Sequence, residues 1–342
     1  MNTLTHPASY SPGLWALAWR RLRHDWVAMG ALSIVLGFLL LILASSTGLI
    51  ADDWDQEIAV NYAPPSFIGA QAPLTDIKQH QTAPPDNPLD PLHDIIAQLK
   101  REMHHAGTDR ITLLEKRSTL PFGADKWGHD IIKKTIKGAE TSIIVGLVAA
   151  VLATLLGTIF GAVSGYFGGW IDDAFNWFYS IFTSIPYLLL ILAVAAVLQQ
   201  KGISTIVLIL ALTGWTGTYR LIRAEYMKHK VREYVMAADA IGASHWRKMV
   251  IHIFPNVSHV ALVQVSILVV GFIKAEVILS FLGFGVPVGV VSWGSMLNEA
   301  QNELILGKWW QLTAASAAMA LLVTAFSLFT DALRDALDPK LK

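Results

Sequence analysis

The sequence predicts an all-α integral membrane protein with six transmembrane helices, cytoplasmic termini and an extracytoplasmic insert after the first helix. Three observations lead to this prediction. Hydrophobic residues make up 54% of the 342 residues and charged residues only 15%, a balance typical of membrane proteins. Long apolar runs recur along the chain, and basic residues gather in short segments between them.

Six apolar segments are long enough, or nearly long enough, to cross the ~30 Å hydrocarbon core of a bilayer. They cover residues 27–49, 140–164, 175–198, 203–219, 257–281 and 311–330. The fourth segment is the shortest, and the fifth is interrupted by Lys274 and Glu276. We keep both as spans, since otherwise the loops beside them would fall on the wrong sides of the membrane.

The charges around the first span set the orientation. Basic residues precede it and acidic residues follow it: Arg20, Arg21 and Arg23, then Asp52, Asp53, Asp55 and Glu57. The amino terminus is therefore expected inside, and six crossings place the basic loop 219–256 and the carboxyl tail there too. The first apolar run exceeds the ~7–15 residues of a cleaved signal peptide, so we expect it to remain as an anchor.

The chain is expected to divide into three parts. Residues 1–50 hold the cytoplasmic amino terminus and the first helix, residues 51–138 form the insert, and residues 139–342 form a five-helix core. Within the insert, an apolar stripe predicts one helix: Leu92, Ile95, Ile96, Leu99 and Met103. The histidines of the insert lack the one-face spacing of a metal site, so no metal is expected.

Composition excludes several classes of function. The net charge is zero, so the chain has no basic field for nucleic acid, and it has no cysteine for disulfides or thiol chemistry. The sequence also lacks the GxxxxGK[ST] phosphate-binding loop. If this chain uses ATP for transport, another chain must hydrolyse it.

The loop 219–256 reads as two short helices joined by a sharp turn. Residues 233–241 can form the first helix, with Ala237 and Ala238 on a small-residue face. Gly242 can end it in the left-handed conformation, and Ser244 can cap a second helix over residues 245–250. Pro255 then ends that helix or begins the next span. Periodicity alone does not separate docking on a protein from an amphipathic loop lying on lipid headgroups.

Four motifs resemble those of binding-protein-dependent ABC importer permeases, most closely the second (C-type) subunit of the oligopeptide, dipeptide and nickel family. The loop resembles that family's EAA loop through Ala237, Ala238, Gly242 and Pro255, with Met236 in the acidic position. The other three stretches are residues 121–138 (PFGADKWGHDIIKKTIKG), residues 165–172 (GYFGGWID) and residues 276–297 (EVILSFLGFGVPVGVVSWGSML). In the first of these, Ala124 and His129 depart from the family's Thr and Arg.

The resemblance implies a fold of the type I ABC importer permease kind, in a multi-pass protein of a bacterial inner membrane. It implies a peptide path shared with a related permease, two ATPase subunits or domains, and an extracytoplasmic solute-binding protein. ATP and Mg would bind the ATPases, and no cofactor would bind this chain. The residues expected at the ATPase contact are Glu233, Ala237, Ala238, Asp239, Gly242, Ala243, Ser244 and Pro255.

Three residues within the spans are candidates for the translocation path or a contact between subunits: Pro186, Lys274 and Glu276. Charges inside a membrane usually face a cavity or the protein interior, but these two could also snorkel to headgroups. Pro186 predicts a kink in the third span, for packing or for gating.

Two other interpretations of the whole chain stay open. One is a permease for nickel or another small solute. The other is a self-contained secondary transporter that would use Lys274 and Glu276 as its polar site.

Overall fold

The computed structural model describes residues 14–69, 95, 116–287 and 289–337, and it is helical throughout this part apart from loops and isolated backbone bridges. The helices are α1 (Leu14–His24), α2 (Trp26–Ser46), α4 (Ile131–Phe167), α5 (Gly169–Thr183), α6 (Tyr187–Leu198), α7 (Ile203–Gly214), α8 (Thr216–Lys230), α9 (Glu233–Ala240), α10 (His245–Arg247), α11 (Phe254–Phe281), α12 (Trp293–Ile305) and α13 (Trp310–Leu337). A π-helical turn, Lys248–Ile253, joins α10 to α11.

Four helices are long and apolar enough to cross a membrane, and six crossings result if each of two bent pairs counts as one span. The four are α2, α4, the continuous helix His245–Phe281 and α13. The bent pairs are α5 with α6 and α7 with α8, which turn by 87° and 42°. The described residues thus confirm an all-helical, multi-pass architecture.

Several helices run past the predicted spans. The helix α4 begins at Ile131 instead of residue 140, and α8 continues to Lys230, well into the predicted loop. Hydropathy marks where hydrocarbon ends, whereas a helix continues for as long as its backbone is hydrogen-bonded. At the start of α4, Asp130 supplies the cap by accepting a hydrogen bond from the Ile132 amide at 2.8 Å.

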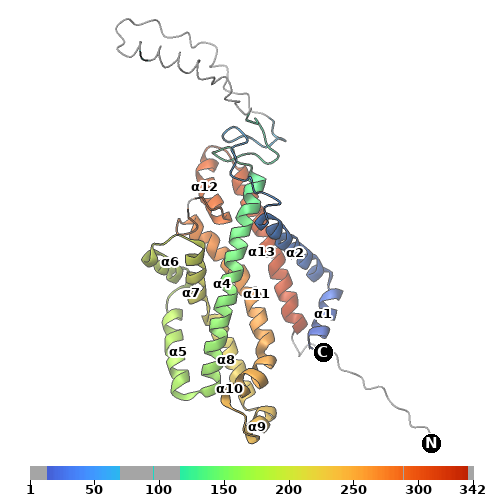
Figure 1. Ribbon diagram of the computed structural model, residues 1–342, viewed down its shortest axis with the longest axis vertical. Coiled ribbons are helices and arrows are strands. Elements are labelled where there is room, and N and C mark those ends of the chain that lie inside the picture. The colour runs from blue at the N-terminus through green and yellow to red at the C-terminus, as the bar shows by residue number, and fades with distance from the viewer. Residues whose placement is uncertain (1–13, 70–94, 96–115, 288, 338–342) are drawn as a thin grey trace, which may run out of the picture.

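The third predicted span is broken at Pro186. The helix α5 ends at Thr183, and α6 begins at Tyr187 with Pro186 as its N-cap residue in an extended conformation (ψ 130°). Proline has no amide to donate within a helix, and it disfavours helical geometry in the residue before it. The predicted kink is therefore present, and at 87° it is sharp enough to turn α6 away from α5 (Figure 1).

The helix α4 is the centre of the bundle and contacts α2, α7, α8, α11 and α13. Its closest neighbour is α8, which it meets along Gly157, Gly161 and Gly165. A Cβ atom on these glycines would lie 2.6, 2.7 and 2.5 Å from the carbonyl oxygens of Trp215, Tyr219 and Arg223, respectively. Only glycine permits this approach, so we call these three residues the glycine seam.

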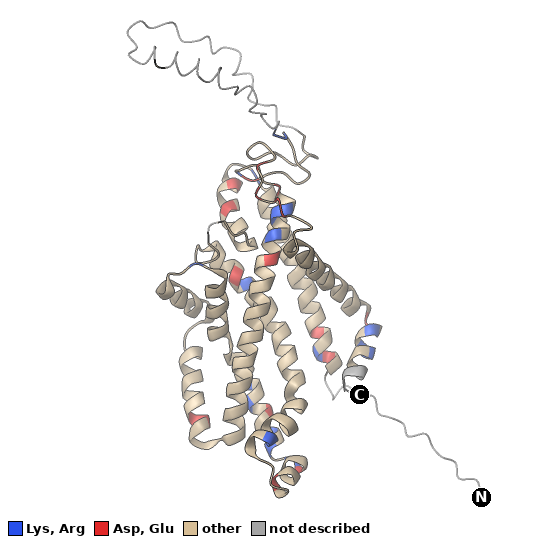
Figure 2. Ribbon diagram, in the orientation of Figure 1, with Lys and Arg blue, Asp and Glu red and all other residues tan. Residues whose placement is uncertain are grey.

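The two ends of the bundle differ. One end carries α9, and the other carries α12 with a cap formed by the described parts of the insert (Figure 1). We call them the α9 end and the α12 end. The helix α1 packs against the last turns of α13 through Ala18, Leu22, Ala336 and Leu337, on the side of the bundle toward α9. Charged residues gather toward both ends, and few lie between them (Figure 2).

The cap is small but has a hydrophobic core of its own. Ala59, Ala63, Leu120 and Ala124 form its core, and the Trp310 indole donates a hydrogen bond to the Ala124 carbonyl at 2.7 Å. Gly128 has φ +89°, and a Cβ there would lie 2.1 Å from the Ala59 carbonyl oxygen, so glycine is required. The apolar stripe predicted around residues 92–103 lies outside the described residues except for Ile95.

The glycine seam yields a first prediction. Gly161→Ala should lower the free energy of unfolding by about 1–3 kcal/mol, because the new methyl group overlaps the α8 backbone. The matched control is Gly271→Ala in α11, where nothing lies within 4 Å of an added Cβ. Thermal unfolding of both variants in nanodiscs checks this expectation. Equal midpoints for the two variants would contradict close packing at the seam.

Candidate functional site

The turn after α9 has the predicted geometry. Gly242 has φ +80°, and its amide donates to the Asp239 carbonyl at 2.9 Å, while the Ala243 amide donates to the Ala238 carbonyl at 3.0 Å. Ser244 then caps α10 by accepting a hydrogen bond from the Arg247 amide at 3.3 Å. These bonds fix the angle between α9 and the helix that follows.

The second short helix differs from the prediction because it does not stop near residue 250. It continues through the π-helical turn into α11, with Pro255 in the first turn of that helix. Proline has no amide for the carbonyl four residues back, and its ring crowds that carbonyl. The wider π turn relieves both problems, so α9 is joined rigidly to a 37-residue helix.

An apolar cluster fastens α9 to the bundle. Val235 of α9 packs with Tyr166 of α4, Tyr226 of α8, and Met249 and Ile253 of the π-helical turn. The Tyr166 hydroxyl lies 2.9 Å from Nδ1 of His245. The Tyr226 hydroxyl donates to the Met249 carbonyl at 3.2 Å. The packing of Val235 holds α9, and the two hydrogen bonds hold the helix that follows its turn.

The ion pair between Lys248 and Asp239 adds to this attachment. Lys248 is buried, and its ammonium group reaches Asp239 near the end of α9. The hydrogen bond and charge of Lys248 hold the pKa of Asp239 below its ordinary value. This pair therefore stays charged at neutral pH.

Three large apolar side chains of this unit are exposed among polar ones. Ile241 is 85% exposed, Trp246 is 72% exposed and Met236 is 54% exposed. We call these three residues the apolar tip. Large apolar side chains presented together on a rigid element are characteristic of a protein or membrane contact.

The residues predicted for the ATPase contact mostly share this exposure. Six are exposed at the α9 end: Glu233, Ala237, Asp239, Gly242, Ser244 and Pro255. Ala238 is buried against the bundle, and Ala243 is partly buried. The structure thus brings the eight residues into one helix–turn–helix, in which six point outward.

Lys274 and Glu276 lie on different sides of α11, because residues two positions apart on a helix do not face each other. Lys274 is exposed, whereas Glu276 is fully buried and accepts hydrogen bonds from the hydroxyls of Ser142 at 2.6 Å and Ser280 at 2.7 Å. The Ser142 hydroxyl also accepts a bond from the Trp293 amide, at the start of α12. Glu276 therefore ties α4, α11 and α12 together.

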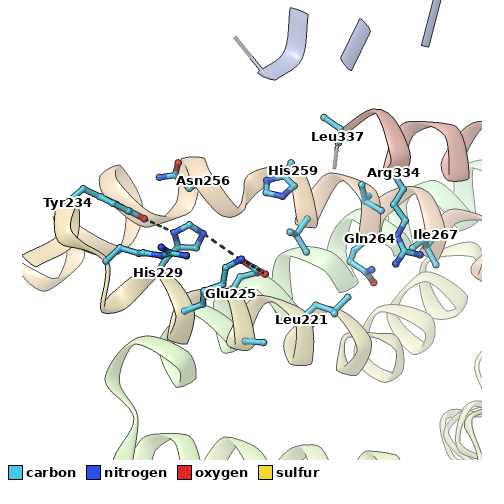
Figure 3. Close-up of a pocket in the computed structure, with 15 residues that line it drawn as sticks. Leu221, Glu225, His229, Tyr234, Asn256, His259, Gln264, Ile267, Arg334 and Leu337 are labelled. Atoms are coloured by element: carbon cyan, nitrogen blue, oxygen red, sulfur yellow. Dashed lines mark hydrogen bonds and ion pairs between the residues drawn. The ribbon is translucent and has the colours of Figure 1, made fainter. Parts of the chain in front are cut away.

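A groove of about 940 Å³ lies between α8, α11 and α13 near the α9 end (Figure 3). Glu225 on its wall pairs with Lys228 at 2.9 Å and His229 at 3.6 Å, and His229 bonds the Tyr234 hydroxyl at 2.8 Å. Pro186, Lys274 and Glu276 do not line this groove. Sequence reasoning missed it, because its walls come from segments far apart in the chain.

A polar network between α5 and α8 was also missed. Asp172 accepts two hydrogen bonds of 2.6 Å from Nε and Nη2 of Arg223, and a further one from the Ser164 hydroxyl. Tyr219 lies 3.0 Å from the same hydroxyl. An Asp and an Arg beside apolar spans were the available signal, since such charges usually pair.

Helices long and apolar enough to span a membrane, packed around the central glycine-lined α4, define the class of a polytopic membrane protein. Residues 153–342 match the family of binding-protein-dependent transport system inner membrane components, and residues 13–65 match the N-terminal transmembrane domain of oligopeptide transport permease C. The first match covers more than half of the chain, so the protein belongs to this family of ABC importer permeases.

Known relatives agree with this assignment. The chain is 38% identical over 221 residues to the dipeptide transport system permease protein DppC of Bacillus subtilis. The matched region covers 65% of this chain and 69% of that relative. The chain is 37% identical over 221 residues to the oligopeptide transport system permease protein OppC of the same organism, covering 65% and 72%. It is 34% identical to the peptidoglycan transport system permease protein YejE of Agrobacterium fabrum over 219 residues, covering 64% and 57%.

The Asp172–Arg223 pair yields a second prediction. Asp172→Asn should destabilise the protein by about 1–3 kcal/mol, because it leaves a partly buried guanidinium without its ionised partner. Asp173→Asn, at the exposed neighbouring position, should be neutral. Thermal unfolding in nanodiscs compares the two. A loss of the same size for Asp173→Asn would refute a specific role for Asp172.

Proposed function

We propose that this chain is the C-type transmembrane subunit of a bacterial inner-membrane importer for short peptides, and that the apolar tip docks on a cytoplasmic ATPase. The observation that carries the proposal is the contrast between the two faces of α9. One face is fixed to α4 and α8 by buried tyrosines, and the other presents Ile241, Trp246 and Met236 outward. A rigid, apolar projection suits a groove on a partner that moves when it binds ATP.

The orientation follows from charge and geometry together. The basic segment Arg20, Arg21 and Arg23 lies in α1, which packs on the last turns of α13, on the same side of the bundle as α9. By the positive-inside rule, this end faces the cytoplasm. Six crossings, with each bent pair taken as one span, then bring both termini to that side.

The division of labour with partners follows from the same assignment. A related permease completes the translocation path, two ATPase subunits or domains bind ATP and Mg, and a solute-binding protein delivers substrate at the α12 end. On this proposal the ATPases carry out ATP hydrolysis, and we expect no cofactor to bind this chain. ATP drives the bundle between two states because the ATPases bind those states unequally.

A short peptide is the favoured substrate because the named relatives include dipeptide and oligopeptide permeases. Nickel or another small solute is the second candidate. Uptake into proteoliposomes that hold the complete importer should occur with labelled di- and tripeptides. Uptake of Ni²⁺ with no peptide transport would overturn the assignment of substrate.

The docking assignment yields a third prediction. Ile241→Asp should weaken ATPase binding roughly tenfold or more and abolish ATP-dependent uptake, because it places a charge in the centre of an apolar contact. The side chain is 85% exposed, so folding should be unaffected. Co-purification of the ATPase and uptake by proteoliposomes measure both effects.

The matched control is Leu49→Asp, which changes an 80% exposed apolar residue in the turn that follows α2. This variant should keep full ATPase binding. Undiminished ATPase binding by Ile241→Asp, or an equal loss in both variants, would refute docking through the apolar tip.

A further inference from the structure

A buried carboxyl group, that of Glu303, lies where the cap, α4, α12 and α13 meet, and it has no role in the contacts described above. Glu303 lies in the last turns of α12 and is only 1% exposed. Neither of its side-chain oxygens has a hydrogen-bond partner among the residues that the structure describes. A buried carboxylate without a partner is costly, so this position needs an explanation.

Around Glu303, negatively charged side chains already outnumber the buried lysine that pairs with them. Lys134 of α4 donates to Asp125 of the cap and to Glu299 of α12, both at 2.6 Å. Asp125 also accepts from Nδ1 of His129 at 2.9 Å. Lys134 is thus paired with two carboxylates, and Glu303 would be a third. An ionised Glu303 would add a third negative charge to a site with little water.

The polar groups on the remaining elements do not stabilise a negative charge on Glu303 by hydrogen bonding to its carboxylate. Gln311 of α13 donates to Glu299 at 3.2 Å and to the Met296 carbonyl at 3.1 Å, so its amide group is occupied by α12. The backbone amide of Lys308 donates to the backbone carbonyl oxygen of Glu303 at 2.9 Å, and not to the carboxylate of Glu303. The backbone amide of Lys126 favours the ionised form but makes no hydrogen bond to the carboxylate.

We propose that Glu303 is a proton-binding site, and that its bound proton holds α12 against the cap and α4. In the neutral form the cluster has two carboxylates with one lysine and a histidine, and the four elements pack together. Release of the proton places three carboxylates in the same space, and their repulsion loosens α12 from the cap. The ligand of this site is the proton itself.

The electrostatics agree with the geometry. Burial, with repulsion from Asp125 and Glu299, raises the pKa of Glu303 from 4.5 to about 7 despite attraction from Lys134. By contrast, burial would also raise the pKa of Asp125, but His129 and Lys134 outweigh it and hold that pKa well below 3.8. Only Glu303 of these two groups therefore changes charge near neutral pH.

The sign of the pH dependence follows. The folded protein keeps on Glu303 a proton that the unfolded chain releases above about pH 4.5, so stability from this group falls as pH rises through about 7. At alkaline pH, Glu303→Gln should raise the unfolding midpoint relative to the wild type. At about pH 5 the two proteins should unfold together, because a neutral Glu and Gln differ little in charge.

The direct test is an infrared titration of the full chain in nanodiscs from about pH 5 to about pH 9. The difference between wild type and Glu303→Gln should contain the carbonyl stretch of a protonated carboxyl group that disappears with a midpoint near pH 7. A difference spectrum without this band across the range would overturn the proposal.

A second variant keeps the test decisive if Glu303→Gln fails to fold. Glu299→Gln removes one neighbouring negative charge, so the midpoint of the Glu303 band should move down by about one pH unit. Glu299 is 30% exposed in its side chain and tolerates this change better than a fully buried residue would. An unchanged or raised midpoint would overturn the proposal.

Discussion

The structure depends on the contact between the backbones of α4 and α8. Gly157, Gly161 and Gly165 recur every four residues and face Trp215, Tyr219 and Arg223, which recur with the same period. Inside a bilayer, apolar side chains gain little by leaving lipid for one another, so close backbone packing and hydrogen bonds must hold helices together. The glycine seam supplies the packing, and the Ser164 hydroxyl of α4 and the Tyr219 hydroxyl of α8, 3.0 Å apart, supply a hydrogen bond between the two helices. The Asp172–Arg223 pair beside the seam adds hydrogen bonds between α5 and α8.

This contact makes α4 the element that joins the two ends of the molecule. With 37 residues, the helix is about 55 Å long. At one end Tyr166 holds the helix–turn–helix that carries α9, and at the other Lys134 holds the cap and α12. One continuous helix thus connects the element proposed to dock on the ATPase with the cap and α12 at the other end. The proposed proton site lies at the far end of that same helix.

Features set by neighbours in the sequence could be predicted. The turn at Gly242 and the Ser244 cap need only local backbone chemistry, and the break at Pro186 needs only the missing amide. The 87° angle at that break is set by packing between helices, which no local pattern contains. Pro255 was harder to interpret, because a π-helical turn let the helix continue where proline usually starts or ends one.

Features set by distant residues were missed for a physical reason. The glycine seam can be read as a four-residue repeat, but the sequence does not say which helix it faces. Lys134 and Glu299 stand 165 positions apart in the sequence. Glu303 is buried only because the fold brings distant segments around it. Charges near predicted spans were the available signal, and their partners required the fold.

The central claim is that the α9 end couples to an ATPase and the α12 end does not. Its most direct test is a photo-cross-linking amino acid placed at Ile241 or, separately, at Ile305, which are 85% and 83% exposed at the two ends. In membranes that hold the whole importer, the account predicts that the probe at position 241 captures the ATPase and the probe at position 305 does not. Capture of the ATPase from position 305, or from neither position, would contradict it.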